Sequence, residues 1–110
     1  MNDITESDWK IFREISIVAL ARFCERALSE FDGALKKHSL SLYDRYIKHY
    51  KLTVKQDKMM ARMFNDLKRS NALDRITFMV EDGLITDKEF ARFSEETQNA
   101  ILLRRQLYGK

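Results

Sequence analysis

The chain has 110 residues, of which 45% are hydrophobic and 34% charged, a balance that is typical of one folded domain and excludes a disordered chain. Proline is absent and glycine occurs three times, so strands and tight turns have little support. The net charge of +3 is below the strong basic excess typical of dedicated nucleic-acid binders. We therefore expect one all-α domain over residues 1–110, a small bundle of three to four helices. Two of them are long, they are antiparallel with short connections, and residues 1–5 and 109–110 are frayed.

The first predicted helix begins after Thr5 or Ser7, either of which can cap the exposed amides, and it ends near Gly33 or Lys37. A helical wheel at about 100° per residue puts its apolar residues on two sides. One side comprises Phe12, Ile15, Val18 and Ala19, and the other comprises Leu20, Phe23, Cys24, Ala27, Leu28, Phe31 and Leu35. The two sides are therefore expected to pack against different partners, one of which is a second copy of the chain.

The second predicted helix begins near Ser39 or Ser41 and contains the segment SLYDRYIKHYK. Apolar residues recur at spacings of three and four, which is the pattern of a buried helix face. They are Tyr43, Tyr46, Ile47, Tyr50 and Val54. The sequence thus predicts that the tyrosines are in the core and the lysines face water; the alternative is a surface for stacking bases. Thr53 and Gln56 match a capping box, so a break near residues 52–54 stays open, although a continuous helix is preferred.

Beyond Val54 the apolar direction of the chain changes, and flexible methionines gather beside a phenylalanine. Such residues line adaptable grooves for partner helices, and they also fill irregular cores. The candidate partner groove consists of Met59, Met60, Met63 and Phe64. A third helical segment from residues 70–71 is expected either to stand alone or to merge with the second helix.

The segment EDGLITDKEF carries the clearest helix boundaries in the chain. Gly83 can adopt the left-handed conformation that ends a helix, and Thr86 with Glu89 forms a capping box for the next one. A last helix is predicted from Ser94, with an apolar side of Ala100, Ile101, Leu103 and Leu107. The segment resembles the second half of an EF-hand loop, but Phe78 and Val80 stand where calcium requires oxygen ligands. A turn followed by a cap is therefore predicted.

Residue types that carry chemistry are few and scattered. Cys24 lies among apolar residues, and His38 and His49 have no cysteine or carboxylate at ligand spacing. No glycine-rich phosphate loop and no helically stacked pair of carboxylates is found. The sequence predicts no catalytic residues, no metal and no cofactor, and therefore a protein that is not an enzyme.

Charge is distributed unevenly along the chain. Residues 36–58 carry seven basic and two acidic side chains, a net charge of +5, whereas residues 81–97 carry two basic and six acidic side chains, a net charge of −4. The basic residues that could contact phosphates are Lys36, Lys37, Arg45, Lys48, Lys51 and Lys55. A solvated face that balances the acidic segments explains the same residues and is preferred.

The expected compartment and function follow from these observations. A single cysteine, a polar first segment and the lack of a long apolar run favour the cytoplasm, with no membrane association. We expect a non-enzymatic interaction or regulatory protein that acts through helix faces, as a homodimer or with a protein partner. A nucleic-acid-associated protein that uses residues 36–58 is the alternative.

Overall fold

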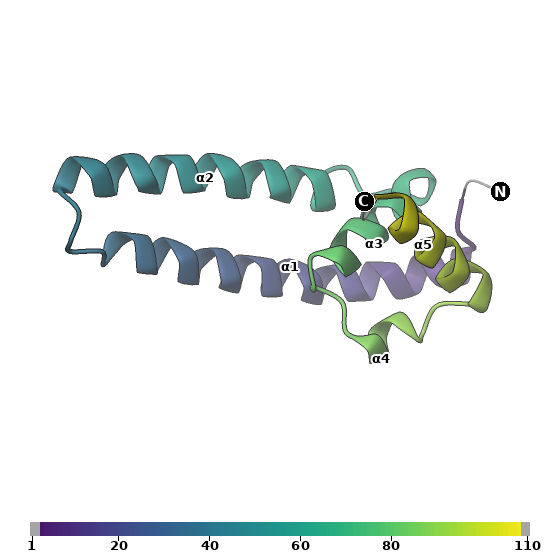
Figure 1. Ribbon diagram of the computed structural model, residues 1–110. Helices are drawn as coiled ribbons and strands as arrows, with labels where there is room; N and C mark the ends of the chain where they lie inside the picture. The colour runs from purple at the N-terminus through teal and green to yellow at the C-terminus, as the bar shows by residue number, and fades with distance from the viewer. Residues whose placement is uncertain (1–2, 109–110) are drawn as a thin grey trace.

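The chain forms an elongated all-α bundle in the computed structural model, which describes residues 3–108 (Figure 1). Its principal extents are 52 × 27 × 24 Å. The described part contains α1 (Glu6–Leu35), α2 (Leu42–Phe64), a 3₁₀ turn (Arg69–Asn71), α3 (Ala72–Glu81), α4 (Asp87–Phe90) and α5 (Glu95–Tyr108). Helices α1 and α2 form a long antiparallel hairpin whose tip lies far from α3, α4 and α5 (Figure 1). The predicted small helical bundle with two long antiparallel helices is confirmed.

The first two helices begin at residues that cap them. The Thr5 hydroxyl accepts a hydrogen bond from the Asp8 amide at 3.1 Å, and the Ser41 hydroxyl accepts one from the Asp44 amide at 3.0 Å. Both caps satisfy amides that have no partner within the helix. Helix α2 continues through Thr53, as preferred from the sequence, and it ends before Asp66, whose φ of 55° is left-handed. The third helix is therefore separate from the second.

The segment between α3 and α4 has the predicted turn and cap. Gly83 has a φ of 73°, its amide donates to the Val80 carbonyl at 3.1 Å, and the Leu84 amide donates to the Met79 carbonyl at 2.9 Å. These two bonds form the Schellman arrangement that ends a helix, with Leu84 buried over the end. Thr86 and Glu89 then form a reciprocal capping box at the start of α4, with bonds of 2.9 and 3.1 Å.

The core lies at the base of the hairpin, where α3 contacts α1, α2 and α5. Helix α1 contributes one buried stripe, which consists of Phe12, Ile15, Ala19, Phe23, Ala27 and Ala34. The prediction that Phe23 and Ala27 lie opposite Phe12 is wrong. Phe12 and Phe23 are eleven residues apart, about three helical turns, so they lie on the same side.

The first described residues are part of the packed structure. Ile4 is 1% exposed, and the Arg69 guanidinium donates to its carbonyl oxygen at 2.9 and 3.2 Å. The expectation of fraying is therefore wrong for Ile4 and Thr5, because burial of one isoleucine and a helix cap fix the backbone there. The same expectation for residues 1, 2, 109 and 110 lies outside the described residues.

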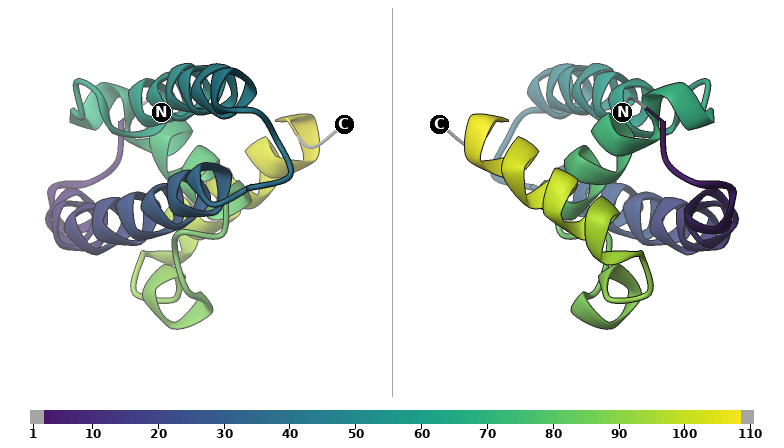
Figure 2. Two further views of the ribbon diagram at one scale, coloured as in Figure 1. Left: turned by 90° about the vertical axis from the view of Figure 1, so that its left-hand side faces the viewer. Right: turned by 90° about the vertical axis from the view of Figure 1, so that its right-hand side faces the viewer.

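Helix α5 lies on one side of the hairpin, and α4 lies beyond α1, away from α2 (Figure 1 and Figure 2). Helix α3 packs between α1 and α2, and α5 packs on α3 from outside. Helix α5 buries Ile101 and Thr97, whereas the predicted apolar positions Leu103 and Leu107 are 57% and 67% exposed. The opposite side of the hairpin has no covering helix within residues 3–108 (Figure 2). None of the described helices has the length and apolarity that crossing a membrane requires.

Candidate functional site

A buried carboxylate connects the two ends of the described chain. Asp8 on α1 is 2% exposed and accepts hydrogen bonds from the Ser94 amide at 2.9 Å, the Ser94 hydroxyl at 2.6 Å and the Thr97 hydroxyl at 2.6 Å. Burial acts to raise the pKa of Asp8, but the hydrogen bonds from Ser94 and Thr97 outweigh it and lower that pKa. Ser94 and Thr97 are both at the start of α5, so this group anchors α5 on α1.

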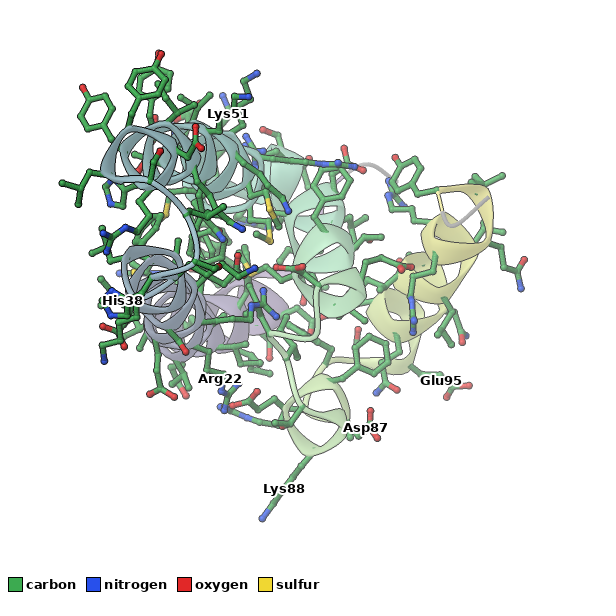
Figure 3. The ribbon with its side chains drawn as sticks, turned by 60° about the vertical axis from the view of Figure 1, so that its left-hand side comes forward. Arg22, His38, Lys51, Asp87, Lys88 and Glu95 are labelled. Carbon is green, nitrogen blue, oxygen red and sulfur yellow. The ribbon has the colours of Figure 1, made fainter. Side chains whose placement is uncertain are left out.

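An ion pair anchors α4 on α1 in the same way. The Arg22 guanidinium contacts both carboxylate oxygens of Glu89 at 2.6 and 3.0 Å and also donates to the Leu84 carbonyl at 2.9 Å. The hydrogen bonds from Arg22, with a smaller contribution from the Thr86 amide, lower the pKa of Glu89 from 4.5 to about 2 although the group is partly buried. Figure 3 shows Arg22 between α1 and the helix that carries Asp87 and Lys88. The acid and the base are fully engaged with each other, so the pair is structural.

The residues with potential for chemistry do not converge. Cys24 is half-buried on α1, His38 lies at the hairpin tip, and the His49 ring packs against Phe31 with centroids 5.3 Å apart. Within residues 3–108, no group of three or more His, Cys, Asp or Glu side chains is placed to hold a metal ion. What these helices offer is surface.

The tyrosines of α2 lie in solvent, so the prediction that they are in the core is wrong. Tyr43, Tyr46 and Tyr50 are 71%, 70% and 61% exposed. The side of α2 that faces α1 instead carries Leu52, Gln56 and Met63, of which Gln56 and Met63 are buried. Both sets of residues recur at helical spacing, so the spacing alone does not decide which face of α2 turns toward α1.

An apolar groove of about 300 Å³ runs between α1 and α2 on the uncovered side of the hairpin. From α1 it is lined by Cys24, Leu28 and Phe31, and from α2 by Thr53, Asp57 and Met60, among others. Tyr46 and Tyr50 precede Thr53 and Asp57 by seven residues, two helical turns, so the tyrosines lie along the same side of α2 as the groove.

Apolar residues of α1 extend this surface beyond the groove. Ile17, Leu28 and Leu35 are 73%, 65% and 52% exposed, and they share the spacing of three and four residues with Leu20, Cys24 and Phe31. We call this surface the open face. It comprises Ile17, Leu20, Cys24, Leu28, Phe31 and Leu35 of α1 and Leu42, Tyr43, Tyr46, Tyr50 and Met60 of α2. The second apolar side predicted for the first helix is thus present, without Phe23 and Ala27.

The predicted partner groove is divided among three places. Met60 lines the groove of the open face, while Met59 and Met63 line a separate hollow of about 240 Å³ that also contacts Phe78. Phe64 packs edge-on against Phe23 with ring centroids 5.9 Å apart. The methionines therefore contribute to two surfaces and to the core, and the larger part of the open face comes from α1 and from the tyrosines.

The predicted phosphate-contacting residues also separate into two groups. Arg45 is half-buried and donates to the Leu35 carbonyl at the end of α1, and Lys36 pairs with Asp32 at 2.9 Å. Lys37, Lys48, Lys51 and Lys55 are exposed, and none of them takes part in the ion pairs found within residues 3–108.

The geometry defines the chain as an elongated all-α protein with an uncovered apolar face. Comparison with protein-family models, with curated proteins and with solved structures finds no match. The function is therefore argued from the surface alone.

Proposed function

We propose that this protein is a non-enzymatic interaction protein that associates with a second copy of itself through the open face. The observation that carries the proposal is a row of large apolar side chains in solvent on both helices of the hairpin. Among them, Ile17 and Tyr46 are 73% and 70% exposed. A contiguous apolar surface of this kind marks an interaction site, because leaving it in water is unfavourable.

The size of the hairpin suits a stable dimer. Helix α1 has 30 residues and is therefore about 45 Å long, and two helices side by side are about 20 Å wide. One side of the hairpin thus offers roughly 900 Å² in projection, near the ~800 Å² per partner of a standard interface. The tyrosines supply rigid aromatic area of the kind that is enriched at interfaces. Two hairpins that bury their open faces together would form a four-helix bundle, and a two-fold axis is the commonest symmetry for such an assembly.

Charge complementarity on α1 favours a second copy over an unrelated partner. Lys10 and Arg13 line the same hollow as Ile17, whereas Glu25 and Asp32 flank Leu28 at helical spacing. Arg13 precedes Ile17 by four residues and Asp32 follows Leu28 by four residues. An antiparallel two-fold pairing that sets Ile17 against Leu28 of the second copy therefore also sets Arg13 against its Asp32.

The proposal includes the cytoplasm as the compartment, supported by the single cysteine Cys24, which is half-buried and free. The proposal leaves the remaining surface free for a transient protein partner. The hypothesis needs no catalytic group, and the hydrogen bonds of Asp8 and Glu89 support a structural role for both.

The test is the molar mass in solution, measured by light scattering after size exclusion between about 1 and 100 µM. The wild type is expected at twice the 13.1 kDa of one chain, and Leu28→Glu at the monomer mass. Leu103→Glu is the matched control, since Leu103 is 57% exposed on α5, away from the open face. A wild type that stays monomeric at 100 µM, or a dimeric Leu28→Glu variant, contradicts the proposal.

A charge exchange tests the antiparallel pairing. Arg13→Glu alone is expected to weaken the dimer by up to about thirtyfold, because the two-fold axis repeats the pair and each exposed ion pair contributes up to about 1 kcal/mol. The double variant Arg13→Glu/Asp32→Arg restores the opposite charges in reversed order and is expected to recover the wild-type affinity. An additive loss in the double variant would exclude this register of α1 against α1.

A further inference from the structure

Four exposed lysines follow one flank of α2, away from the open face. Lys48, Lys51, Lys55 and Lys58 recur at spacings of three and four residues, so they line one side of the helix. Figure 3 shows Lys51 on the outer side of α2, pointing away from α1. We call these residues, together with Lys37 of the hairpin tip, the lysine ladder.

The ladder and the tyrosines occupy different flanks of the helix. At about 100° per residue, Lys48, Lys51 and Lys55 are centred more than 90° from Tyr46 and Tyr50. Between residues 3 and 108, the ion pairs of the fold include no lysine of the ladder. The positive charge of this flank is thus available to an external anion.

Two cations of the ladder come together at the hairpin tip. The side chain of Lys48 lies beside that of Lys37, and this neighbour lowers the pKa of Lys48, because two ammonium groups are both donors and repel each other. The proximity of Lys37 and Lys48 joins α2 to the connection between α1 and α2, in which Lys37 lies. An anion placed between two ammonium groups relieves their repulsion, so this point favours the binding of a phosphate.

We propose that the lysine ladder binds the phosphate backbone of duplex nucleic acid, without base specificity. The run from Lys48 to Lys58 spans ten residues, about 15 Å of helix, which matches several successive phosphates of one strand. Single-stranded binding is disfavoured, because a stacking platform needs aromatic rings beside the cations and the tyrosines lie on the other flank. Binding to an acidic protein would not require cations at regular intervals along one line, whereas the phosphates of a duplex are regularly spaced. The spacing of the lysines therefore favours a duplex as the partner.

The proposal is independent of the proposed dimer, because the ladder lies outside the open face. The Leu28→Glu variant therefore tests the dimer, while lysine variants test the ladder. In a dimer the two ladders would remain exposed and would increase the apparent affinity for a long duplex through avidity.

The experiment is a fluorescence-anisotropy titration of a labelled 20-base-pair DNA duplex of arbitrary sequence, repeated from 50 to 200 mM salt. Five phosphate contacts predict a log–log salt slope of about −4 to −5, a loss of several hundredfold in affinity across this range. Lys51→Ala/Lys55→Ala is expected to reduce the slope by about 2. Between 50 and 200 mM salt, the affinity of this variant is therefore expected to fall about fortyfold instead of several hundredfold. A different arbitrary sequence is expected to bind within about threefold.

The matched control is Lys68→Ala/Lys88→Ala, which removes the same charge from exposed residues outside both the ladder and the open face. It is expected to keep the wild-type slope. Equal effects of the two double variants would overturn the proposal in favour of general charge attraction, and an absence of binding at 50 mM salt would overturn it outright. Tighter binding of single-stranded DNA, of polyglutamate or of anionic vesicles than of the duplex would overturn the choice of partner.

Discussion

The ion pair between Arg22 and Glu89 allows a prediction whose size follows from the structure. The pKa of Glu89 falls from 4.5 to about 2 because it accepts two hydrogen bonds from Arg22. At about 1.4 kcal/mol per pKa unit this shift corresponds to about 3 kcal/mol of stability. The Arg22 side chain is 36% exposed, so solvent screens part of the attraction and about 1–2 kcal/mol is expected.

Glu89→Gln isolates the charge, because the amide oxygen can still accept the hydrogen bond from Thr86 in the capping box. The unfolded-state pKa lies above the folded-state value, so the stabilisation is complete above about pH 5 and is lost as the pH falls toward about 2. We expect the variant to unfold at lower urea concentration at pH 7, with a difference that shrinks by more than half between pH 5 and 3.

Urea unfolding followed by circular dichroism, at several pH values, measures this difference. Glu14→Gln is the control, because the Glu14–Arg92 pair is more exposed, at 67% and 45%, and is expected to contribute little at any pH. Parallel stability curves for the wild type and Glu89→Gln, or an equal effect of Glu14→Gln, would refute the assignment of the pKa shift to Arg22.

Three further substitutions test the packing. Asp8→Asn replaces a buried, charge-assisted acceptor of three hydrogen bonds and is expected to destabilise the fold by about 1.5–3 kcal/mol in urea unfolding, with α5 losing hydrogen-exchange protection first. Phe23→Ala is expected to cost about 3–5 kcal/mol at every protein concentration, because Phe23 is 2% exposed. Tyr46→Ala, in contrast, is expected to change the stability of the dilute monomer by less than about 0.5 kcal/mol.

Features set by neighbouring residues could be predicted from the sequence. The caps at Thr5 and Ser41, the left-handed Gly83 and the capping box of Thr86 and Glu89 all involve groups no more than a few residues apart. Each satisfies backbone groups at a helix end, and the residue types that can do so are few. The starts of α1, α2 and α4 and the end of α3 followed from them, whereas the all-α class followed from the absence of proline and the scarcity of glycine.

Contacts between distant residues gave no comparable signal. Asp8 and Ser94 are 86 residues apart, and Arg22 and Glu89 are 67 apart, so nothing in their local sequence indicates that they meet. Asp8 reads locally as an acid in the first turn of a helix, and Glu89 as part of a cap. Their second roles require the packing of α4 and α5 on α1, which only the fold supplies.

The tyrosines show where helical periodicity is insufficient. A spacing of three and four residues identifies a face but not the direction in which it points, and α2 carries two such faces. The less apolar face turns inward, with Gln56 buried, and the face that carries the tyrosines turns to solvent. The more apolar face is left in solvent, which is a reason to expect that another chain covers it.

The two proposed surfaces are compatible because of the side on which α3 packs. Helix α3 enters between α1 and α2 from one side, and this leaves the opposite side of the hairpin uncovered (Figure 2). A second copy on that side would cover Tyr46 and Leu28 while Lys51, on the outer side of α2, stays in water. Burying lysines in the same interface would cost more than exposing them, so the segregation of tyrosines from lysines on α2 would allow one helix to serve both proposed partners, one apolar and one anionic.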